Sequence, residues 1–202
     1  MAFRLFTLFA ALSVLCVLSS CGSGSDEDPK PTSFTKNTTN EVNYTLNGEK
    51  HSYKEGSKYF GGLGSSSSIG SRSRYDYSFG FGDFNENVYF EITSGTLANN
   101  GTFLPPGYFY DFFQKGSYTY GLDTLHPDIS MVFADDNGAL WYTDSVNTQS
   151  GSFEVTDTLG FIGPDLYPYK KIKANFSCDV AESKNGPIKK ITNGSLVVVF
   201  GY

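Results

Sequence analysis

Tyr75-Asp76-Tyr77-Ser78-Phe79-Gly80-Phe81-Gly82 places an aromatic side chain at every second position and a small or acidic residue between them. Successive side chains of a β-strand point to opposite faces, so this pattern predicts a strand with one wholly aromatic face. Val88, Phe90 and Ile92 repeat the alternation a short distance later. The range 75–93 is therefore expected to form a β-hairpin.

Similar alternation flanks turn signals elsewhere in the chain. Val42, Tyr44 and Leu46 alternate with polar residues before Asn47-Gly48, and the range 49–53 returns. Asn-Gly favours a type I′ turn, because both of its positions need a positive φ. The same pair recurs, mostly between apolar runs, at 100–101, 137–138, 185–186 and 193–194.

The remaining pattern also predicts strands and turns. Short strands are expected at 129–134, 139–143, 152–156, 171–180, 188–192 and 195–200. The Gly/Ser-rich range 61–73 predicts a mobile loop, and 95–128 is less regular. The 14 Tyr, 18 Phe and 22 Gly, against 1 Trp and 2 Met, suit a pleated surface joined by turns. We therefore predict an all-β domain over residues 41–202, a single antiparallel β-sandwich of hairpin-connected strands.

The N-terminal segment has a different character. Arg4 precedes an apolar run from Leu5 to Val17 that is too short to span a bilayer comfortably, which is typical of a secretion signal. The run ends in Leu18-Ser19-Ser20-Cys21, and a Gly/Ser/Pro/Asn/Thr-rich stretch follows. This organisation predicts a signal peptide over 1–20, a flexible tether over 21–40 and the β-sandwich over 41–202.

Leu18-Ser19-Ser20-Cys21 resembles a bacterial lipobox. The resemblance implies that the Cys21 thiol carries diacylglycerol, that cleavage precedes Cys21, and that a fatty acyl chain such as palmitate modifies the new amine. Acyl chains bury about 0.8 kcal/mol per methylene group, so two or three of them anchor a protein stably in a membrane. The alternative is an ordinary secretory signal with nearby cysteines.

Acidic residues at 26–28 follow the serine-rich start of the tether. They resemble the export signal of Bacteroidota surface lipoproteins, which implies an outer-membrane protein facing outwards. A solvated acidic linker, with the domain facing the periplasm, is the alternative. The segments at 151–155, 174–177 and 191–196, with Leu46-Asn47-Gly48, also resemble small β-sandwich lipoproteins of Bacteroidota, mostly without assigned activity. This second resemblance implies fold and location only.

Charge and cysteine content exclude several classes of function. Removing residues 1–20 removes Arg4 from 15 basic residues and leaves all 21 acidic ones, so the exported chain is acidic. Nucleic acid is a poor partner for such a chain, because phosphate neutralisation supplies most of that affinity. Cys16 lies in the signal and Cys21 is the lipidation site, which leaves Cys178. Its period-two apolar surroundings predict a buried, inert thiol.

The sequence contains no Gly-x-Ser-x-Gly nucleophile motif, and its only histidines are His51 and His126. Asp83, Asn85 and Asn87 resemble the start of an EF-hand loop. The sixth and twelfth loop positions, however, hold a valine and a serine instead of glycine and glutamate. We expect no catalytic residue, no bound metal and no cofactor.

Two carboxylates in one cleft would suffice for glycoside hydrolysis. Glu91, Asp144 and Glu154 lie on or beside expected strands and are the candidates. If they catalyse, two of them must share a cleft at about 5–10 Å separation. Solvent-facing positions on the sheets are the simpler interpretation.

Aromatic residues concentrate between 103 and 120. Tyrosine and tryptophan rings stack on the apolar faces of sugars or form rigid contacts with protein partners. The candidate ligand-binding residues are Tyr108, Tyr110, Tyr118, Tyr120 and Trp141. The alternative is that this cluster packs in the core or anchors loops, because phenylalanine is equally frequent in it.

Asp followed by Ser or Thr and an aliphatic residue resembles the O-glycosylation sequon of secreted Bacteroidota proteins. It occurs with acceptors Thr124, Ser145 and Thr158, and modification implies that these three lie on exposed loops.

The leading hypothesis is a non-catalytic, lipid-anchored binding protein of the outer membrane whose ligand is a glycan or a surface protein. A small hydrolase acting on polysaccharide or peptide and a structural part of a surface assembly are the alternatives. For the last, a long unpaired edge strand would be the sign.

Overall fold

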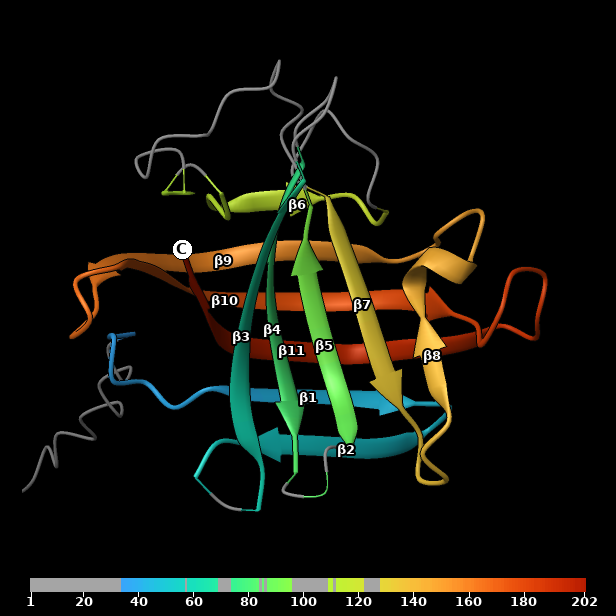
Figure 1. The fold of residues 1–202 in the computed structure, drawn as a ribbon. Helices are drawn as coiled ribbons and strands as arrows, with labels where there is room; N and C mark the ends of the chain where they lie inside the picture. The colour runs from blue at the N-terminus through green and yellow to red at the C-terminus, as the bar shows by residue number, and fades with distance from the viewer. Residues whose placement is uncertain are drawn as a thin grey trace, which may run out of the picture. The chain divides into compact units, whose positions relative to one another are not determined.

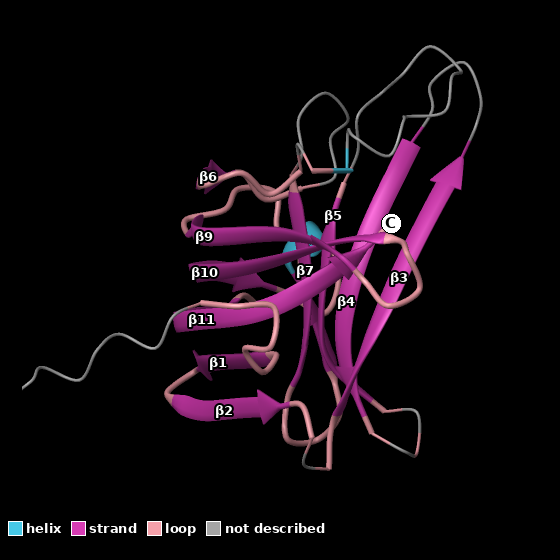
Figure 2. Cartoon of the chain, turned by 90° about the vertical axis from the view of Figure 1, so that its left-hand side faces the viewer, coloured by secondary structure: helices cyan, strands magenta, loops and turns pink. Residues whose placement is uncertain are grey.

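Two antiparallel β-sheets pack face to face in the computed structural model (Figures 1 and 2). The structure describes residues 34–56, 58–68, 74–83, 85, 87–95, 109–110, 112–121 and 128–202. Residues 34–202 form one compact unit, and the sheets do not close into a barrel. The predicted all-β sandwich is confirmed.

The first sheet has six strands in the order β2-β1-β11-β10-β9-β6. Its strands are β1 (Glu41–Leu46), β2 (Glu49–Lys54), β6 (Gly116–Tyr118), β9 (Ser152–Ile162), β10 (Pro168–Val180) and β11 (Lys189–Gly201). The β1–β2 turn follows the prediction, since Asn47 and Gly48 both have positive φ, at 50° and 92°. The strand order places β11, the last strand of the chain, at the centre of this sheet and beside β1.

The second sheet has five strands in the order β3-β4-β5-β7-β8. Its strands are β3 (Phe60–Ser68), β4 (Arg74–Gly82), β5 (Val88–Ser94), β7 (Ile129–Ala134) and β8 (Leu140–Tyr142). A short 3-10 helix, η1 (Thr143–Ser145), follows β8. In Figure 1 the strands of this sheet run across those of the six-stranded sheet behind them.

The aromatic face of 75–82 forms one wall of the core. Tyr77, Phe79 and Phe81 on β4 are buried, as are Phe90 and Ile92 on β5. The facing wall comes from the six-stranded sheet, whose inward side chains include Phe153, Ile172, Phe176, Val198 and Phe200. The period-two pattern thus predicted the 75–93 hairpin correctly and identified which of its residues lie inside.

The mobile loop predicted over 61–73 is wrong for its first part, because residues 60–68 form β3. This strand pairs with β4 in unbroken register, from Phe60 opposite Gly82 to Ser68 opposite Arg74. The Phe79 ring covers Gly61 so closely that an added Cβ would lie 2.7 Å from it. Glycine is required at this contact, although it removes the side-chain alternation that identifies a strand in sequence.

Two other boundaries differ from prediction. The Asn193-Gly194 pair lies inside β11, where Asn193 has a φ of 52° at an irregularity in the pairing with β1 and β10. The strands expected at 188–192 and 195–200 are therefore one bulged strand. Residues 34–40, predicted to belong to the tether, are part of the compact unit.

Candidate functional site

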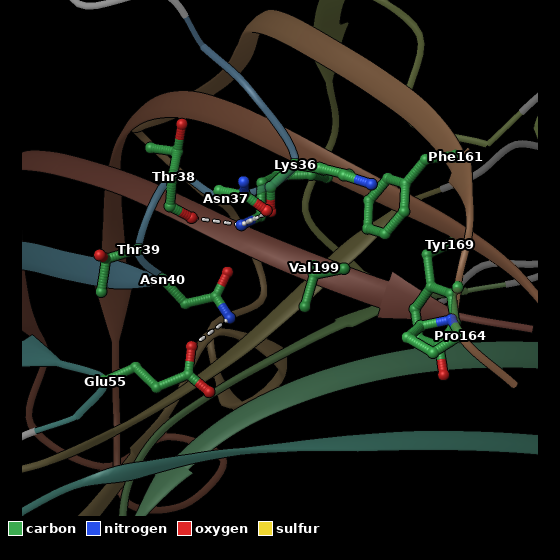
Figure 3. Close-up of a pocket in the computed structure, with 12 residues that line it drawn as sticks. Lys36, Asn37, Thr38, Thr39, Asn40, Glu55, Phe161, Pro164, Tyr169 and Val199 are labelled. Atoms are coloured by element: carbon green, nitrogen blue, oxygen red, sulfur yellow. Dashed lines mark hydrogen bonds between the residues drawn. The ribbon is translucent and has the colours of Figure 1, made fainter.

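A pocket of about 370 Å³ lies on the outer face of the six-stranded sheet. Its walls come from the chain entering β1, the start of the β2–β3 connection, and the β9–β10 hairpin (Figure 3). The residues that line it are Lys36, Asn37, Thr38, Thr39, Asn40, Glu55, Phe161, Gly163, Pro164, Tyr169, Lys171 and Val199. Aromatic and apolar residues lie on one side of the view, and polar residues lie on the other.

The aromatic side is set by strand register. Phe161 on β9 pairs directly with Tyr169 on β10, and both side chains point away from the core. Their rings stack with centroids 5.6 Å apart and planes 15° apart. The Tyr169 hydroxyl donates a hydrogen bond to Asp165, which fixes the tyrosine ring against the hairpin loop. An added Cβ at Gly163 would lie 2.2 Å from the Tyr169 ring, so a larger residue at this loop position would displace that ring.

The polar side centres on Asn40 and Glu55. Asn40 is 6% exposed, and its Nδ2 donates to Glu55 Oε2 at 2.7 Å. Among the described residues its Oδ1 is buried and accepts no hydrogen bond. A buried amide oxygen without a donor costs roughly 1–3 kcal/mol, so a ligand hydroxyl that reaches it would recover this energy.

Lys171 shapes the rim of the pocket. Its side chain is 4% exposed, and its ammonium donates to the backbone carbonyls of Lys36, at 3.0 Å, and Thr38. Burial lowers the pKa of Lys171, while the nearby Glu55 carboxylate acts in the opposite direction. The lysine therefore fastens the chain at 36–38 over the sheet, and the pocket depends on that attachment.

These features together fit a sugar ring. An aromatic wall can receive the apolar face of a pyranose, and a few polar groups beside it can fix the ligand's orientation. Glu55 provides carboxylate oxygens, Asn40 an amide oxygen, and Lys36 an exposed cation. The site contains neither a nucleophile with an adjacent base nor a carboxylate pair among its lining residues.

Trp141, which was predicted to bind ligand, does not line this pocket, and its side chain interacts with other residues of the protein. Trp141 on β8 is 5% exposed, and its Nε1 donates to Asp135 Oδ2 at 3.1 Å. The Lys189 ammonium lies 3.6 Å from the centroid of its ring and also pairs with Asp135 at 3.1 Å. Both the polar edge and one face of the indole are thus already occupied.

The three described tyrosines of the predicted cluster pack half-buried against the core. The Tyr120 hydroxyl donates to the carbonyls of Ser152 and Ser177, and that of Tyr118 donates to the carbonyl of Gln114. Burial raises the pKa of Tyr118 to about 12. Tyr110 donates to the Phe161 carbonyl. The loop-anchoring interpretation therefore describes these residues, and Tyr108 lies outside the described residues.

The fold separates two of the three candidate carboxylates, Glu91 and Glu154. Glu91 lies on β5 between the buried Phe90 and Ile92, so it faces outwards from the five-stranded sheet. Glu154 lies on β9 between the buried Phe153 and Val155, so it faces outwards from the other sheet. Asp144 is exposed on η1. Glu91 and Glu154 therefore lie on opposite outer faces and cannot share a cleft.

The described residues weighed as metal or nucleophilic sites are either hydrogen-bonded within a loop or buried. The Asp83 carboxylate accepts hydrogen bonds from the Asn85 and Asn87 backbone amides, the Asn87 side chain and the Tyr89 hydroxyl, as a hairpin loop does. Within the described ranges, no group of three or more His, Cys, Asp or Glu could hold a metal. Cys178 is buried, and burial raises the pKa of its thiol. His51 is buried, while His126 falls outside the described residues.

The candidate glycosylation acceptors occupy different environments. Ser145 lies half-exposed at the end of η1, as expected for an accessible turn. Thr158 does not lie on a loop: it is paired with Ile172 within β9, and its Oγ1 is buried. The expected exposure is therefore wrong for Thr158, because β9 continues well beyond the predicted 152–156. Thr124 lies outside the described residues, as does Cys21.

Sequence reasoning missed Phe161, Tyr169 and the polar residues around them. The available signal was the segment from Phe161 to Tyr169, in which Gly163-Pro164-Asp165 marks a turn between two aromatic residues. This turn lies between two paired strands only because β9 and β10 extend beyond the expected ranges 152–156 and 171–180.

No family model, curated protein or solved structure matches this chain. In the described part of the chain, no helix has the length and apolar character required to cross a membrane.

Proposed function

We propose that the domain is a non-catalytic carbohydrate-binding module, and that the pocket beside Phe161 and Tyr169 receives a sugar residue. The observation that carries the proposal is the combination of the stacked aromatic pair with the buried, unpaired Asn40 amide oxygen on the facing wall. An apolar sugar face would pack on the Tyr169 side, and hydroxyl groups would donate to Asn40 and Glu55. The acidic chain and the mixed polar lining suit a neutral or amino sugar better than an anionic one.

We further propose that the module is anchored to the bacterial outer membrane through lipid on Cys21, with the domain facing outwards. The support is the sequence Leu18-Ser19-Ser20-Cys21 followed by the acidic residues at 26–28. In this proposal the chain that follows Cys21 acts as the tether between the lipid and the β-sandwich. Surface glycans would then be the accessible partners.

Replacing Tyr169 with alanine is expected to weaken glycan binding by about tenfold, since loss of one aromatic stacking contact costs about 1.4 kcal/mol. The measurement is binding of residues 22–202 to a printed glycan array, followed by calorimetric titration of the tightest hit. Phe161→Ala should give a similar loss, because it removes the support of the Tyr169 ring.

Tyr167→Ala is the matched control. Tyr167 lies on the same hairpin loop and is 56% exposed, but it does not line the pocket. Its replacement should leave affinity unchanged. Equal losses in the Tyr167 and Tyr169 variants, or an unaltered Tyr169→Ala protein, would show that sugars do not bind here.

The anchor makes a separate prediction. Cys21→Ser should abolish incorporation of labelled fatty acid and release the protein from the membrane fraction, because the acylated thiol is lost. Cys178→Ser, which changes a buried thiol, should leave labelling intact. Undiminished labelling of the Cys21→Ser protein would refute lipidation at this residue without affecting the pocket.

A further inference from the structure

The β9–β10 hairpin ends in a tip, residues 162–167, that presents apolar side chains to solvent. Leu166 is 82% exposed, Ile162 is 57% exposed and Tyr167 is 56% exposed. Within the described ranges, these are three of the four large hydrophobic side chains that are more than half exposed. Single exposed hydrophobic residues are common on proteins, but a group within one short loop points to an interaction site.

The backbone at Leu166 gives a second indication. Leu166 has a φ of 67°, in the left-handed region that glycine and asparagine adopt at lower cost. Its side chain is so exposed that packing within the protein returns little of this cost. Residues held in such conformations are concentrated at functional sites. The fold alone therefore does not account for a leucine at this position.

The backbone amides of the tip have hydrogen-bond partners inside the hairpin. The Gly163 amide donates to the Tyr167 carbonyl at 2.9 Å, and the Leu166 amide donates to the Gly163 carbonyl at 3.1 Å. The Tyr167 amide donates to the Asp165 carboxylate, which also accepts from the Tyr169 hydroxyl and is thereby held toward β10. A loop whose amides are paired in this way can leave water at low cost, because lipid offers no replacement hydrogen bonds.

The tip lies at the end of the six-stranded sheet where the chain enters the domain. Lys36, Asn37 and Thr38, which precede β1, line the same pocket as Gly163 and Pro164 of the tip. In Figure 1 the chain entering β1 and the β9–β10 hairpin both lie at the left of this sheet, and the β10–β11 connection lies at the right. The two connections are about 40 Å apart along the 13 residues of β10. A membrane that holds the N-terminal segment is therefore attached at the end that carries the tip.

We propose that the hairpin tip inserts its apolar side chains into the surface of the bilayer to which the chain is anchored. The choice of a lipid surface rests on the proposed anchor at Cys21, because that anchor brings a membrane to this end of the domain. Leu166 and Ile162 reach the boundary of the acyl chains, and Tyr167 lies among the headgroups, where tyrosine is enriched. Weak insertion is sufficient, since the anchor keeps the tip at a high local concentration beside the bilayer.

The test uses residues 22–202 with an N-terminal hexahistidine tag, held on phosphatidylcholine vesicles by a nickel-chelating lipid. This synthetic anchor replaces lipid on Cys21, so a failure here is distinct from a failure of lipidation. A fluorophore on Leu166→Cys should be quenched about twofold or more by quencher lipids in the bilayer. Ile188→Cys is the matched control: it is 59% exposed beside the start of β11, at the opposite end, and its fluorophore should stay in water. Cys178 is buried and does not compete for the label.

Charge variants give a second readout that needs no label. Leu166→Asp should be released from these vesicles by imidazole about tenfold faster or more, because a carboxylate opposes insertion and the apolar burial is lost. Ile188→Asp should be released like the wild-type chain. Equal quenching at positions 166 and 188, or unchanged release of Leu166→Asp, contradicts the proposal. So does a fluorophore at 166 that is shielded only at high protein density, which would show a contact between copies.

Discussion

Phe133→Ala should lower the free energy of unfolding of residues 22–202 by about 4 kcal/mol, one of the largest losses available to a single substitution. Phe133 on β7 is fully buried, and its ring contacts both sheets. Its centroid lies 4.9 Å from that of Tyr44 on β1, 5.6 Å from that of Phe90 on β5, and 6.1 Å from that of Phe176 on β10. Truncation therefore leaves a cavity at the contact between the sheets.

Urea unfolding followed by circular dichroism measures this loss. Phe133→Leu should cost less than half as much, because it retains most of the buried volume. Val88→Ala, at an exposed position on the neighbouring β5, should change the free energy of unfolding by no more than about 0.5 kcal/mol. A loss below about 1 kcal/mol for Phe133→Ala would mean that the sheets do not pack through this residue.

Raising the pH above about 10.5 should destabilise the domain steeply, by about 3 kcal/mol per pH unit from Tyr44 and Tyr77 alone. These phenols are 2% and 3% exposed, and burial raises the pKa of each far above its ordinary value of 10.0. In the unfolded chain they lose their protons above that ordinary pKa, whereas in the folded chain they keep them. The unfolded state then binds fewer protons, so stability falls as pH rises.

Lys171 does not offset this effect. Burial lowers its pKa, so it adds stability as pH rises toward its ordinary value of 10.5. Above that value it is neutral in both states and contributes no further pH dependence. The steep alkaline loss expected from the buried phenols therefore remains.

The free energy of unfolding, measured by urea titration at several pH values above 10.5, tests this prediction. Tyr77→Phe keeps the buried ring and removes the titrating hydroxyl, so it should reduce the slope by about 1.4 kcal/mol per pH unit. Tyr167→Phe, at a position 56% exposed, should leave the slope unchanged. Identical slopes in the wild-type and Tyr77→Phe proteins would show that Tyr77 ionises freely in the folded state.

The sequence predicted the sandwich because apolar and polar side chains alternate at period two along many of its strands. Wherever β-branched or aromatic residues recur at period two, as in 75–82 and 171–180, the strand and its buried face were identified correctly. The same reasoning failed at β3, where glycine and serine leave no alternation to observe. That strand is specified by its partner, since the Phe79 ring requires Gly61 beneath it.

The binding residues were harder to predict for a related reason. Composition identifies tyrosines but does not show which of them find partners inside the protein. The hydroxyl of Tyr120 donates to the Ser152 and Ser177 carbonyls, which belong to segments distant from it in sequence. Phe161 and Tyr169 become a binding surface only through the β9–β10 register, which places them side by side on the outer face.

The most direct test of the carbohydrate site is a crystal structure of residues 22–202 with the tightest sugar from the glycan array. We expect a pyranose ring against Tyr169 and Phe161, with a ligand hydroxyl donating to Asn40 Oδ1. A sugar bound on another face, or an array without any ligand whose binding depends on Tyr169, would contradict it.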